Sequence, residues 1–298
     1  MNIIIYGPTA VGKTGASLFL AKKLNAEILS ADSAQIYRKL NIGTAKVSIN
    51  EMEGIKHHLI DFLNPFEEFN ASIFSNSSMN IINDLNKKGI STITVGGTAL
   101  YLRALIDGMS DAPPSNAKIR EKLETMSKED LYDKLKEVDP LYAQTLSPNN
   151  LQRVRRALEI FLISGKSITK FNKNHLIDKN KEKIHFFKYA LNMDRKALYE
   201  RIDKRVDLMF EDGLLEEAIN IYNKYGTLPK IIGYKELQDF IEGNGDLNDS
   251  INHIKKNSRN YAKRQITWLN KMEDFKIIDV EKYNPVEYIL EDLDSIKK

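Results

Sequence analysis

Eight consecutive residues near the start of the chain have the types and spacing of a phosphate-binding loop. They match the pattern G-x-x-x-x-G-K-[ST]. The two glycines let successive backbone N–H groups turn toward one anion, and the lysine places a cation on terminal phosphate oxygens. The threonine hydroxyl is a suitable ligand for Mg²⁺. We therefore expect a di- or triphosphate, with Mg²⁺ held by Thr14, on Gly7, Pro8, Thr9, Ala10, Val11, Gly12, Lys13 and Thr14.

The segments around this loop are the ones that it requires. Residues 3–6 are a short apolar run typical of a buried parallel strand, and residues 15–24 have a helical pattern. The N-terminal end of that helix adds a partial positive charge next to the anion. A chance glycine-rich turn is the alternative, and the ordered strand, loop, Lys-Thr and helix argue against it. The loop does not say whether the phosphate is donor, leaving group or regulator.

Two further groups follow predicted strands. Asp32 comes directly after the predicted strand 26–31, and Thr98 follows strand 90–95 and a Gly-Gly pair. Ligands of open parallel sheets bind at the carboxyl ends of the strands. Asp32 can hold Mg²⁺ or accept a proton from a nucleophile there, and Thr98 can donate to an anion. Both residue types also cap helices, and spacing alone leaves the alternatives open.

The adjacent pair His57 and His58 does not predict a metal site. A strand sends neighbouring side chains to opposite faces, which is poor geometry for two ligands of one ion. We interpret the pair as a polar strand end.

Strand patterns alternate with helix patterns along most of the chain. This order predicts an α/β fold, a P-loop NTPase-like parallel sheet flanked by helices, built from residues 1–112 and 182–298. Pro113 and Pro114 break the pattern, and residues 116–165 are helical without a convincing strand. We therefore expect an all-helical insertion, residues 113–181, that acts as a lid or substrate clamp. Within it, residues 169–175 are expected to form a polar, basic loop.

A basic stripe is predicted on a helix in the segment 251–271. Lys255, Arg259 and Lys263 recur every four residues and share one helix face, and no acidic residue occurs between positions 250 and 272. Solvated helix faces usually mix charges of both signs, so this stripe favours contact with a polyanion such as a phosphate backbone. An ordinary solvated face is the alternative.

Composition sets broad limits on the class of protein. The chain has 298 residues, 42% hydrophobic and 29% charged, as in ordinary globular proteins. No apolar run approaches the length of a membrane span, and the predicted strand at the first residues leaves no room for a signal peptide. The absence of Cys excludes disulfides and thiolate metal sites, and it fits the cytoplasm, where we expect the protein. The net charge of +3 does not by itself identify a nucleic-acid binder.

Several short motifs occur in a fixed order between residue 3 and about residue 270. They are Gly-Pro-Thr-Ala-x-Gly-Lys-Thr at 7–14, Asp-Ser-x-Gln-x-Tyr at 32–37, Gly-Thr-Ala-Lys at 43–46, His-His-Leu-Ile-Asp at 57–61, Gly-Gly-Thr-x-Leu-Tyr at 96–101, Arg-x-x-Arg-Ala-Leu-Glu at 153–159, Asp-Arg-x-x-Leu-Tyr-x-Arg-Ile at 194–202, Ile-Gly-Tyr-Lys-Glu at 232–236 and Tyr-Ala-Lys-Arg-Gln-x-Thr-Trp at 261–268. In this order they resemble the bacterial tRNA dimethylallyltransferases. Ala99, Val47 and Asn150 depart from that pattern, which commonly has Gly, Pro and Asp there.

The resemblance implies a reaction and its partners. The family moves a dimethylallyl group from dimethylallyl diphosphate to N6 of the adenosine that follows the anticodon of a tRNA. The phosphate-binding loop would then hold the donor's diphosphate with Mg²⁺, rather than ATP. A diphosphate leaving group needs the same neutralisation of charge as a transferred phosphoryl group. We expect a monomer that binds the anticodon stem-loop.

The resemblance also implies roles for single residues. Asp32 would be the general base, and Lys13 would act on the leaving group. Thr98 and Arg195 would steady the diphosphate and the reacting centre. Contacts to tRNA would come from the motif that follows the second strand, from the helical insertion and from the basic stripe: Asp32, Ser33, Ala34, Gln35, Thr98, Arg120, Gln152, Arg153, Val154, Arg155, Arg156, Lys255, Arg259 and Lys263.

Two other functions are compatible with the phosphate-binding loop. A small-molecule kinase would share the loop and a helical lid, but it gives no reason for the basic stripe. A non-catalytic RNA-binding module would use the stripe, but it leaves Asp32 and Thr98 without a role.

Overall fold

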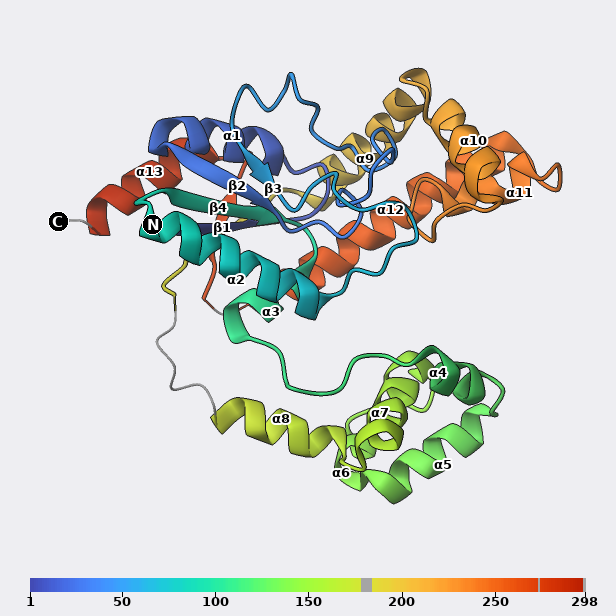
Figure 1. Cartoon of the computed structure of the whole chain (residues 1–298). Helices are drawn as coiled ribbons and strands as arrows, with labels where there is room; N and C mark the ends of the chain where they lie inside the picture. The colour runs from blue at the N-terminus through green and yellow to red at the C-terminus, as the bar shows by residue number, and fades with distance from the viewer. Residues whose placement is uncertain (178–183, 273, 297–298) are drawn as a thin grey trace. The chain divides into compact units, whose positions relative to one another are not determined.

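The computed structural model describes residues 1–177, 184–272 and 274–296. The chain divides into two compact units (Figure 1). Unit 1 comprises Met1–Asp107 and Ile184–Lys298, and unit 2 comprises Gly108–Lys183. The expected insertion, residues 113–181, lies within unit 2, and its expected end at residue 181 lies outside the described residues.

Unit 1 contains a six-stranded sheet in which every paired strand runs parallel to its neighbours. The order across the sheet is β3-β2-β4-β1-β5-β6, so that the first strand lies in the middle. The parallel sheet confirms the predicted fold class. The strands are β1 (Asn2–Tyr6), β2 (Ala26–Ser30), β3 (His57–His58), β4 (Ser91–Gly96), β5 (Phe187–Asn192) and β6 (Lys276–Asp279).

Helices cover both faces of this sheet (Figure 1). The helices α1 (Lys13–Leu24) and α13 (Pro285–Ile296) pack on one face, against the side chains of Ile3 and Ile5. The opposite face, with Ile4 and Tyr6, packs against α2 (Ala71–Lys87) and α3 (Ala99–Asp107). All five residues of β1 are buried, which is why residues 3–6 form a continuous apolar run rather than an alternating one.

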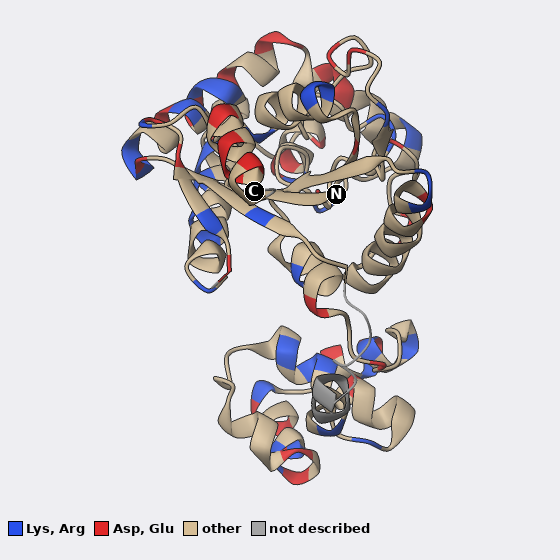
Figure 2. Cartoon of the chain, turned by 90° about the vertical axis from the view of Figure 1, so that its left-hand side faces the viewer, with Lys and Arg blue, Asp and Glu red and all other residues tan. Residues whose placement is uncertain are grey.

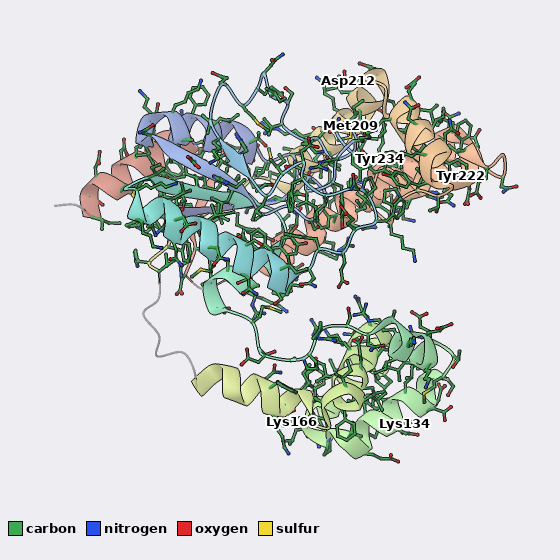
Figure 3. The ribbon with its side chains drawn as sticks, in the orientation of Figure 1. Lys134, Lys166, Met209, Asp212, Tyr222 and Tyr234 are labelled. Carbon is green, nitrogen blue, oxygen red and sulfur yellow. The ribbon has the colours of Figure 1, made fainter. Side chains whose placement is uncertain are left out.

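A helical extension follows β5 within unit 1. The hydrophobic core of this extension includes Leu40, which lies in the long connection that follows β2. Met209, Tyr222 and Tyr234, labelled in Figure 3, belong to the same core. The carboxyl edge of the sheet is therefore flanked by helices that come late in the sequence. They are α9 (Arg195–Glu211), α10 (Leu214–Tyr225), the 3₁₀ turn η2 (Lys235–Leu237), α11 (Gln238–Ile241) and α12 (Leu247–Leu269).

Helices are the only regular secondary structure in the described part of unit 2. Leu131, Leu135, Val154 and Leu158 form its core. Helix-capping side chains define its segments; the Ser127 hydroxyl, for example, accepts a hydrogen bond from the backbone of Asp130 at 3.1 Å. The helices are α4 (Ala117–Glu124), α5 (Lys128–Val138), α6 (Pro140–Gln144), α7 (Leu151–Ser164) and α8 (Ile168–Ile177).

Helix α8 corrects one expectation, because the predicted loop at 169–175 lies inside it. The carboxylate of Asp139 accepts hydrogen bonds from the backbone and the hydroxyl of Thr169, at 2.9 and 2.7 Å. Ile168 packs against the core of unit 2. A tertiary cap thus starts a helix whose polar sequence gave no amphipathic signal.

The C-terminal segment contains two elements that the pattern of the sequence did not predict. Strand β6 and helix α13 bury Ile278, Ile289 and Leu293 in the core around the sheet, although acidic residues dominate the exposed side of α13 (Figure 2). Among the described helices, none has the length and apolarity needed to cross a lipid bilayer.

Candidate active site

The phosphate-binding loop joins β1 to α1 and has the strained backbone that its function requires. Ala10 and Gly12 have φ angles of 65° and 103°, in the left-handed region. Gly7 approaches β5 so closely that a Cβ there would lie 2.7 Å from the carbonyl oxygen of Leu191. The ammonium group of Lys13 donates to the carbonyl of Pro8, at 2.7 Å, across the loop. Burial lowers the pKa of Lys13 to about 7; the charge of Asp32 opposes this shift and that of Arg205 adds to it.

Asp32 lies at the carboxyl end of β2, next to the loop. Its Oδ1 accepts hydrogen bonds from the backbone N–H groups of Ala34 and Gln35, at 2.8 and 3.3 Å. Oδ2 makes no hydrogen bond to the described part of the chain. The capping and the catalytic interpretations of this residue are therefore compatible, since one oxygen holds the turn and the other is left for a ligand.

Two adjoining cavities meet at this carboxylate. The first measures about 400 Å³ and is lined by Lys13, Thr14 and Asp32 among others. The second measures about 360 Å³ and extends toward α9 and the loop before η2. Asp32, Arg205 and Tyr261 line both cavities. A ligand in one cavity and a ligand in the other would therefore meet beside the same three side chains.

Arg205 occupies the place that was expected for Arg195. The exposed Arg195 donates to the hydroxyl of Tyr199 at 2.8 Å, lies over its ring, and lines neither cavity. The half-buried Arg205 donates to the hydroxyl of Thr9, in the phosphate-binding loop, at 3.2 Å. Burial lowers the pKa of Arg205 and the charge of Asp32 opposes that shift. Arg205 is thus the second cation beside the loop in this structure, and the expected role of Arg195 stays a prediction.

The sequence contains a signal for Arg205, although Arg205 was not among the predicted site residues. Leu198, Ile202 and Val206 are the buried positions of α9, so Arg201 and Arg205 flank its inward face one turn apart. Both arginines line the first cavity. Helical spacing identifies them as neighbours of the core, but it does not say which part of the sheet that face reaches.

Gln265 of α12 connects the phosphate-binding loop to the turn after β4. Its side-chain oxygen accepts from the backbone of Thr9 at 2.8 Å, and its nitrogen donates to the carbonyl of Gly97 at 2.9 Å. A Cβ on Gly97 would lie 2.0 Å from that nitrogen, so the contact requires glycine. Helix α12, which was predicted to contact nucleic acid, therefore also fixes the phosphate-binding loop and the turn after β4 through Gln265.

Thr98 and Tyr261 complete the surroundings of Asp32. The Thr98 hydroxyl accepts from the backbone of Ser33 at 3.1 Å, and it donates to the Ser33 hydroxyl at 3.3 Å. In this structure, Thr98 thus holds the residue next to Asp32. Burial, and then the charge of Asp32, raises the pKa of Tyr261 to about 12, so this hydroxyl stays protonated at neutral pH.

The basic stripe of α12 is not unbalanced, which corrects the expectation drawn from the sequence. Lys255 pairs with Asp207 at 2.5 Å, and Arg259 pairs through one nitrogen with both oxygens of Asp203 at 2.5 and 2.6 Å. The carboxylates come from α9, which packs beside α12, and are therefore far away in sequence. Lys263 is exposed and has no ion pair among the described residues. A tRNA contact by the three residues stays a prediction.

In unit 2, one carboxylate forms ion pairs with two of the arginines that were expected to bind tRNA. Glu159 is buried and accepts from Arg120 at 3.0 Å, from Arg156 at 2.6 Å and from the backbone of Asn116 at 2.7 Å. Both guanidinium groups keep further N–H donors. Among the other residues expected there, Gln152 and Arg153 are exposed, Arg155 is half-buried, and Val154 is fully buried in the core and cannot reach a ligand.

His57 and His58 form the short strand β3, in agreement with the polar strand end that was favoured. His57 contacts the carbonyl of Ile55 and His58 contacts the carboxylate of Glu27, at 2.8 and 2.5 Å. No cluster of three or more His, Asp or Glu side chains suited to a metal occurs in the described ranges.

Comparison with known proteins places these features in one family. The model of the IPP transferase family matches residues 35–272. A tRNA dimethylallyltransferase of Fusobacterium nucleatum is 41% identical over 290 residues, covering 96% of this chain and 94% of the relative. One from Caldanaerobacter subterraneus is 40% identical over 300 residues, covering 98% and 95%.

Solved structures agree with the sequence relatives. A tRNA isopentenylpyrophosphate transferase from Bacillus halodurans superimposes with a TM-score of 0.72 at 38% identity, covering 99% of this chain and 95% of the other. The structure of a eukaryotic dimethylallyltransferase acting on tRNA gives 0.79 at 31% identity, covering 93% and 73%.

Proposed function

The chain belongs to the IPP transferase family, and from this premise we propose that it transfers a dimethylallyl group from dimethylallyl diphosphate to N6 of the adenosine that follows the anticodon of a tRNA. Its relatives over nearly the whole chain are prenyltransferases that modify tRNA. The observation that carries the proposal for this chain is the position of Asp32, which borders both cavities and shares the first one with Lys13 and Arg205.

Asp32, Lys13 and Arg205 would each assist a different part of the reaction. N6 of the adenine attacks C1 of the dimethylallyl group, the C1–O bond breaks, and its electron pair leaves with the diphosphate. Asp32 accepts the proton that N6 loses. Lys13, Arg205 and the amides of the phosphate-binding loop stabilise the negative charge that develops on the leaving group. The proton acceptor thus acts on the nucleophile, and the cations act on the leaving group of the same displacement.

Mg²⁺ fits the donors that the first cavity offers. Thr14 lines the cavity together with Lys13, and its hydroxyl would hold the ion. Mg²⁺ is commonly held by one or two protein oxygens together with water and substrate phosphates, which is consistent with the lack of a larger ligand cluster in the described residues. When bound, it would neutralise charge on the diphosphate.

The tRNA would contact basic residues of unit 1 and of unit 2. Flipping the adenine out of its stack costs about a few kcal/mol, less in a loop than in a duplex. The exposed side chains of Arg120, Arg153 and Lys263 and the half-buried guanidinium group of Arg156 offer compensating phosphate contacts. We propose that the protein acts as a monomer in the cytoplasm.

One assay tests this function. The protein is incubated with Mg²⁺ and total tRNA, and with either labelled dimethylallyl diphosphate or labelled ATP. Label in RNA from the diphosphate alone supports the proposal. Turnover of ATP without RNA would instead identify a small-molecule kinase, and tRNA binding with no product would identify a non-catalytic RNA-binding module. Either result overturns the proposal.

A further inference from the structure

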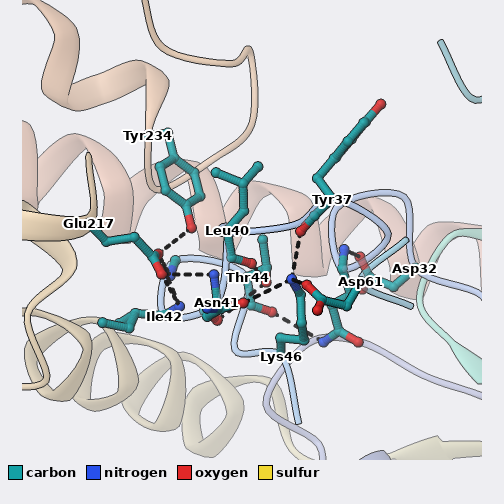
Figure 4. A network of polar contacts seen from close by, with 12 residues as sticks. Asp32, Tyr37, Leu40, Asn41, Ile42, Thr44, Lys46, Asp61, Glu217 and Tyr234 are labelled. Atoms are coloured by element: carbon teal, nitrogen blue, oxygen red, sulfur yellow. Dashed lines mark hydrogen bonds and ion pairs between the residues drawn. The ribbon is translucent and has the colours of Figure 1, made fainter. Parts of the chain in front are cut away.

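The loop of residues 41–45, which follows β2, is held by a carboxylate from a distant helix. Glu217, in the first turn of α10, accepts hydrogen bonds from three successive backbone N–H groups: Asn41 at 2.9 Å, Ile42 at 3.0 Å and Gly43 at 3.2 Å (Figure 4). The hydroxyl of Tyr234 donates a fourth bond at 2.5 Å. Burial, and then the charge of Glu217, raises the pKa of Tyr234, so its hydroxyl remains a donor.

Side-chain packing and a buried lysine further restrict the conformation of this loop. A Cβ on Gly43 would lie 2.7 Å from the ring of Tyr234. The side chain of Lys46, only 5% exposed, donates to the carbonyl of Tyr37 at 2.6 Å and pairs with Asp61 at 2.6 Å. The loop is therefore fixed at both ends (Figure 4).

The same loop reaches the catalytic carboxylate through one side chain. The amide nitrogen of Gln35 donates to the carbonyls of Thr44 and Ala45, at 3.2 and 3.1 Å. The backbone N–H of Gln35 donates to Oδ1 of Asp32. Thr44 lines both cavities together with Asp32, whereas Glu217 lines neither.

From this connected series we infer that Glu217 is a positioning residue for the transfer reaction. It holds the 41–45 loop as the wall of both cavities and, through Gln35, fixes the turn that orients Asp32. Its carboxylate touches neither cavity, so we expect its loss to affect the alignment of the reacting groups and to leave the phosphate-binding loop, residues 7–14, in place. A displacement of about 1 Å at reacting atoms can reduce a rate about 100-fold. The inference rests on the proposed role of Asp32.

The test uses Glu217→Gln, which keeps the size of the side chain and removes the negative charge. Glu216→Gln is the matched control, because Glu216 is exposed in the same helical turn and makes none of the contacts to residues 41–43. We expect Glu217→Gln to lower the single-turnover rate of dimethylallyl transfer about 10- to 100-fold. The dissociation constant of inorganic diphosphate, measured by calorimetry, should change less than about twofold, and the control should match the wild type.

Chemical rescue provides a second test. Glu217→Ala leaves the three N–H groups of residues 41–43 without an acceptor, and formate has the charge and shape to replace the carboxylate. We expect added formate to raise the rate of Glu217→Ala saturably, while sodium chloride at the same ionic strength does not. If Glu217→Ala does not fold and therefore loses diphosphate binding, the rate of Glu217→Gln decides whether Glu217 is a positioning residue.

Several results would overturn the inference. They are a wild-type rate in Glu217→Gln, an equal loss in Glu216→Gln, or a loss of diphosphate affinity as large as the loss of rate. Failure of the proposed function looks different, because the wild type itself would then transfer no group to tRNA. Asp32→Asn serves as the reference: its inactivity beside a fully active Glu217→Gln would reject only the role of Glu217.

Discussion

Arg205 of α9 donates a hydrogen bond to the hydroxyl of Thr9, which lies 196 residues earlier in the phosphate-binding loop. This contact brings a second cation to the diphosphate site, beside Lys13, and both cations lie within the electrostatic influence of Asp32. The fold thus places the base and the two groups that stabilise the leaving group around one cavity.

Replacing Arg205 separates its role from that of Arg195. We expect Arg205→Ala to lower kcat/KM for dimethylallyl diphosphate about 100-fold, because a preorganised donor to the leaving group is lost. Arg195→Ala should have a much smaller effect, since Arg195 contacts Tyr199 outside both cavities. Steady-state kinetics of both variants check this, and an equal or larger loss in Arg195→Ala would contradict it.

Asp32→Asn tests the general base. The amide keeps the acceptor oxygen for the turn at Ala34 and Gln35 but cannot take a proton. We expect the single-turnover rate to fall about 100- to 10,000-fold, while tRNA affinity in a filter-binding assay stays nearly unchanged. Transfer at the full rate would remove Asp32 from the mechanism.

The pKa of Lys13 predicts a pH dependence of diphosphate binding. Its value of about 7 in the free protein means that a large share of Lys13 is neutral at pH 8, whereas a bound diphosphate favours the charged form. Binding at pH 8 should therefore take up protons, and affinity should fall as pH rises above about 7. Calorimetry in buffers of different ionisation enthalpy measures this uptake. Lys13→Met corrects for the protons of the diphosphate itself, and an equal uptake in both proteins would refute the assignment.

Lys263 and Arg259 should differ in their effect on tRNA binding. Lys263 is exposed without an ion pair in the described chain, so Lys263→Ala should weaken tRNA binding and lower the salt slope by about 1. Arg259 is paired with Asp203, so Arg259→Ala should affect mainly the packing of α12 on α9. Binding titrations over a range of salt, combined with thermal melts, compare the two. The reverse pattern would show that the ion pair opens for the RNA.

Glu159→Gln should destabilise unit 2. Burial raises the pKa of Glu159, but hydrogen bonds from Arg156 and Asn116 outweigh it and leave the pKa below its ordinary value. The stability contributed by Glu159 is therefore present above pH 4.3, roughly its ordinary pKa, and is lost as pH falls further. At pH 7 we expect Glu159→Gln to lower the free energy of unfolding by about 2 kcal/mol. Denaturant titrations at pH 7 and at acid pH check both statements, and a difference that persists unchanged in acid would contradict the second.

The local patterns of the sequence determined most of the elements and part of the site. A continuous apolar run, a glycine-spaced loop and a Lys-Thr pair occur within twelve residues, so β1, the phosphate-binding loop and α1 followed directly from 3–14. Asp32 and Thr98 could be placed at the same sheet edge because parallel strands end there. Helix α8 and the β6–α13 segment escaped prediction, because a distant cap stabilises the helix and packing on the core around the sheet stabilises the segment.

Only the tertiary structure decided which charges are free and which are engaged. The acids that pair with Lys255 and Arg259 come from another helix, so the sequence of α12 alone showed an unbalanced stripe. Arg205 reaches the phosphate-binding loop, and Glu217 holds the 41–43 amides, across more than 170 residues of intervening chain. Periodicity fixes the face of a helix on which a side chain lies, but only packing determines what that face meets.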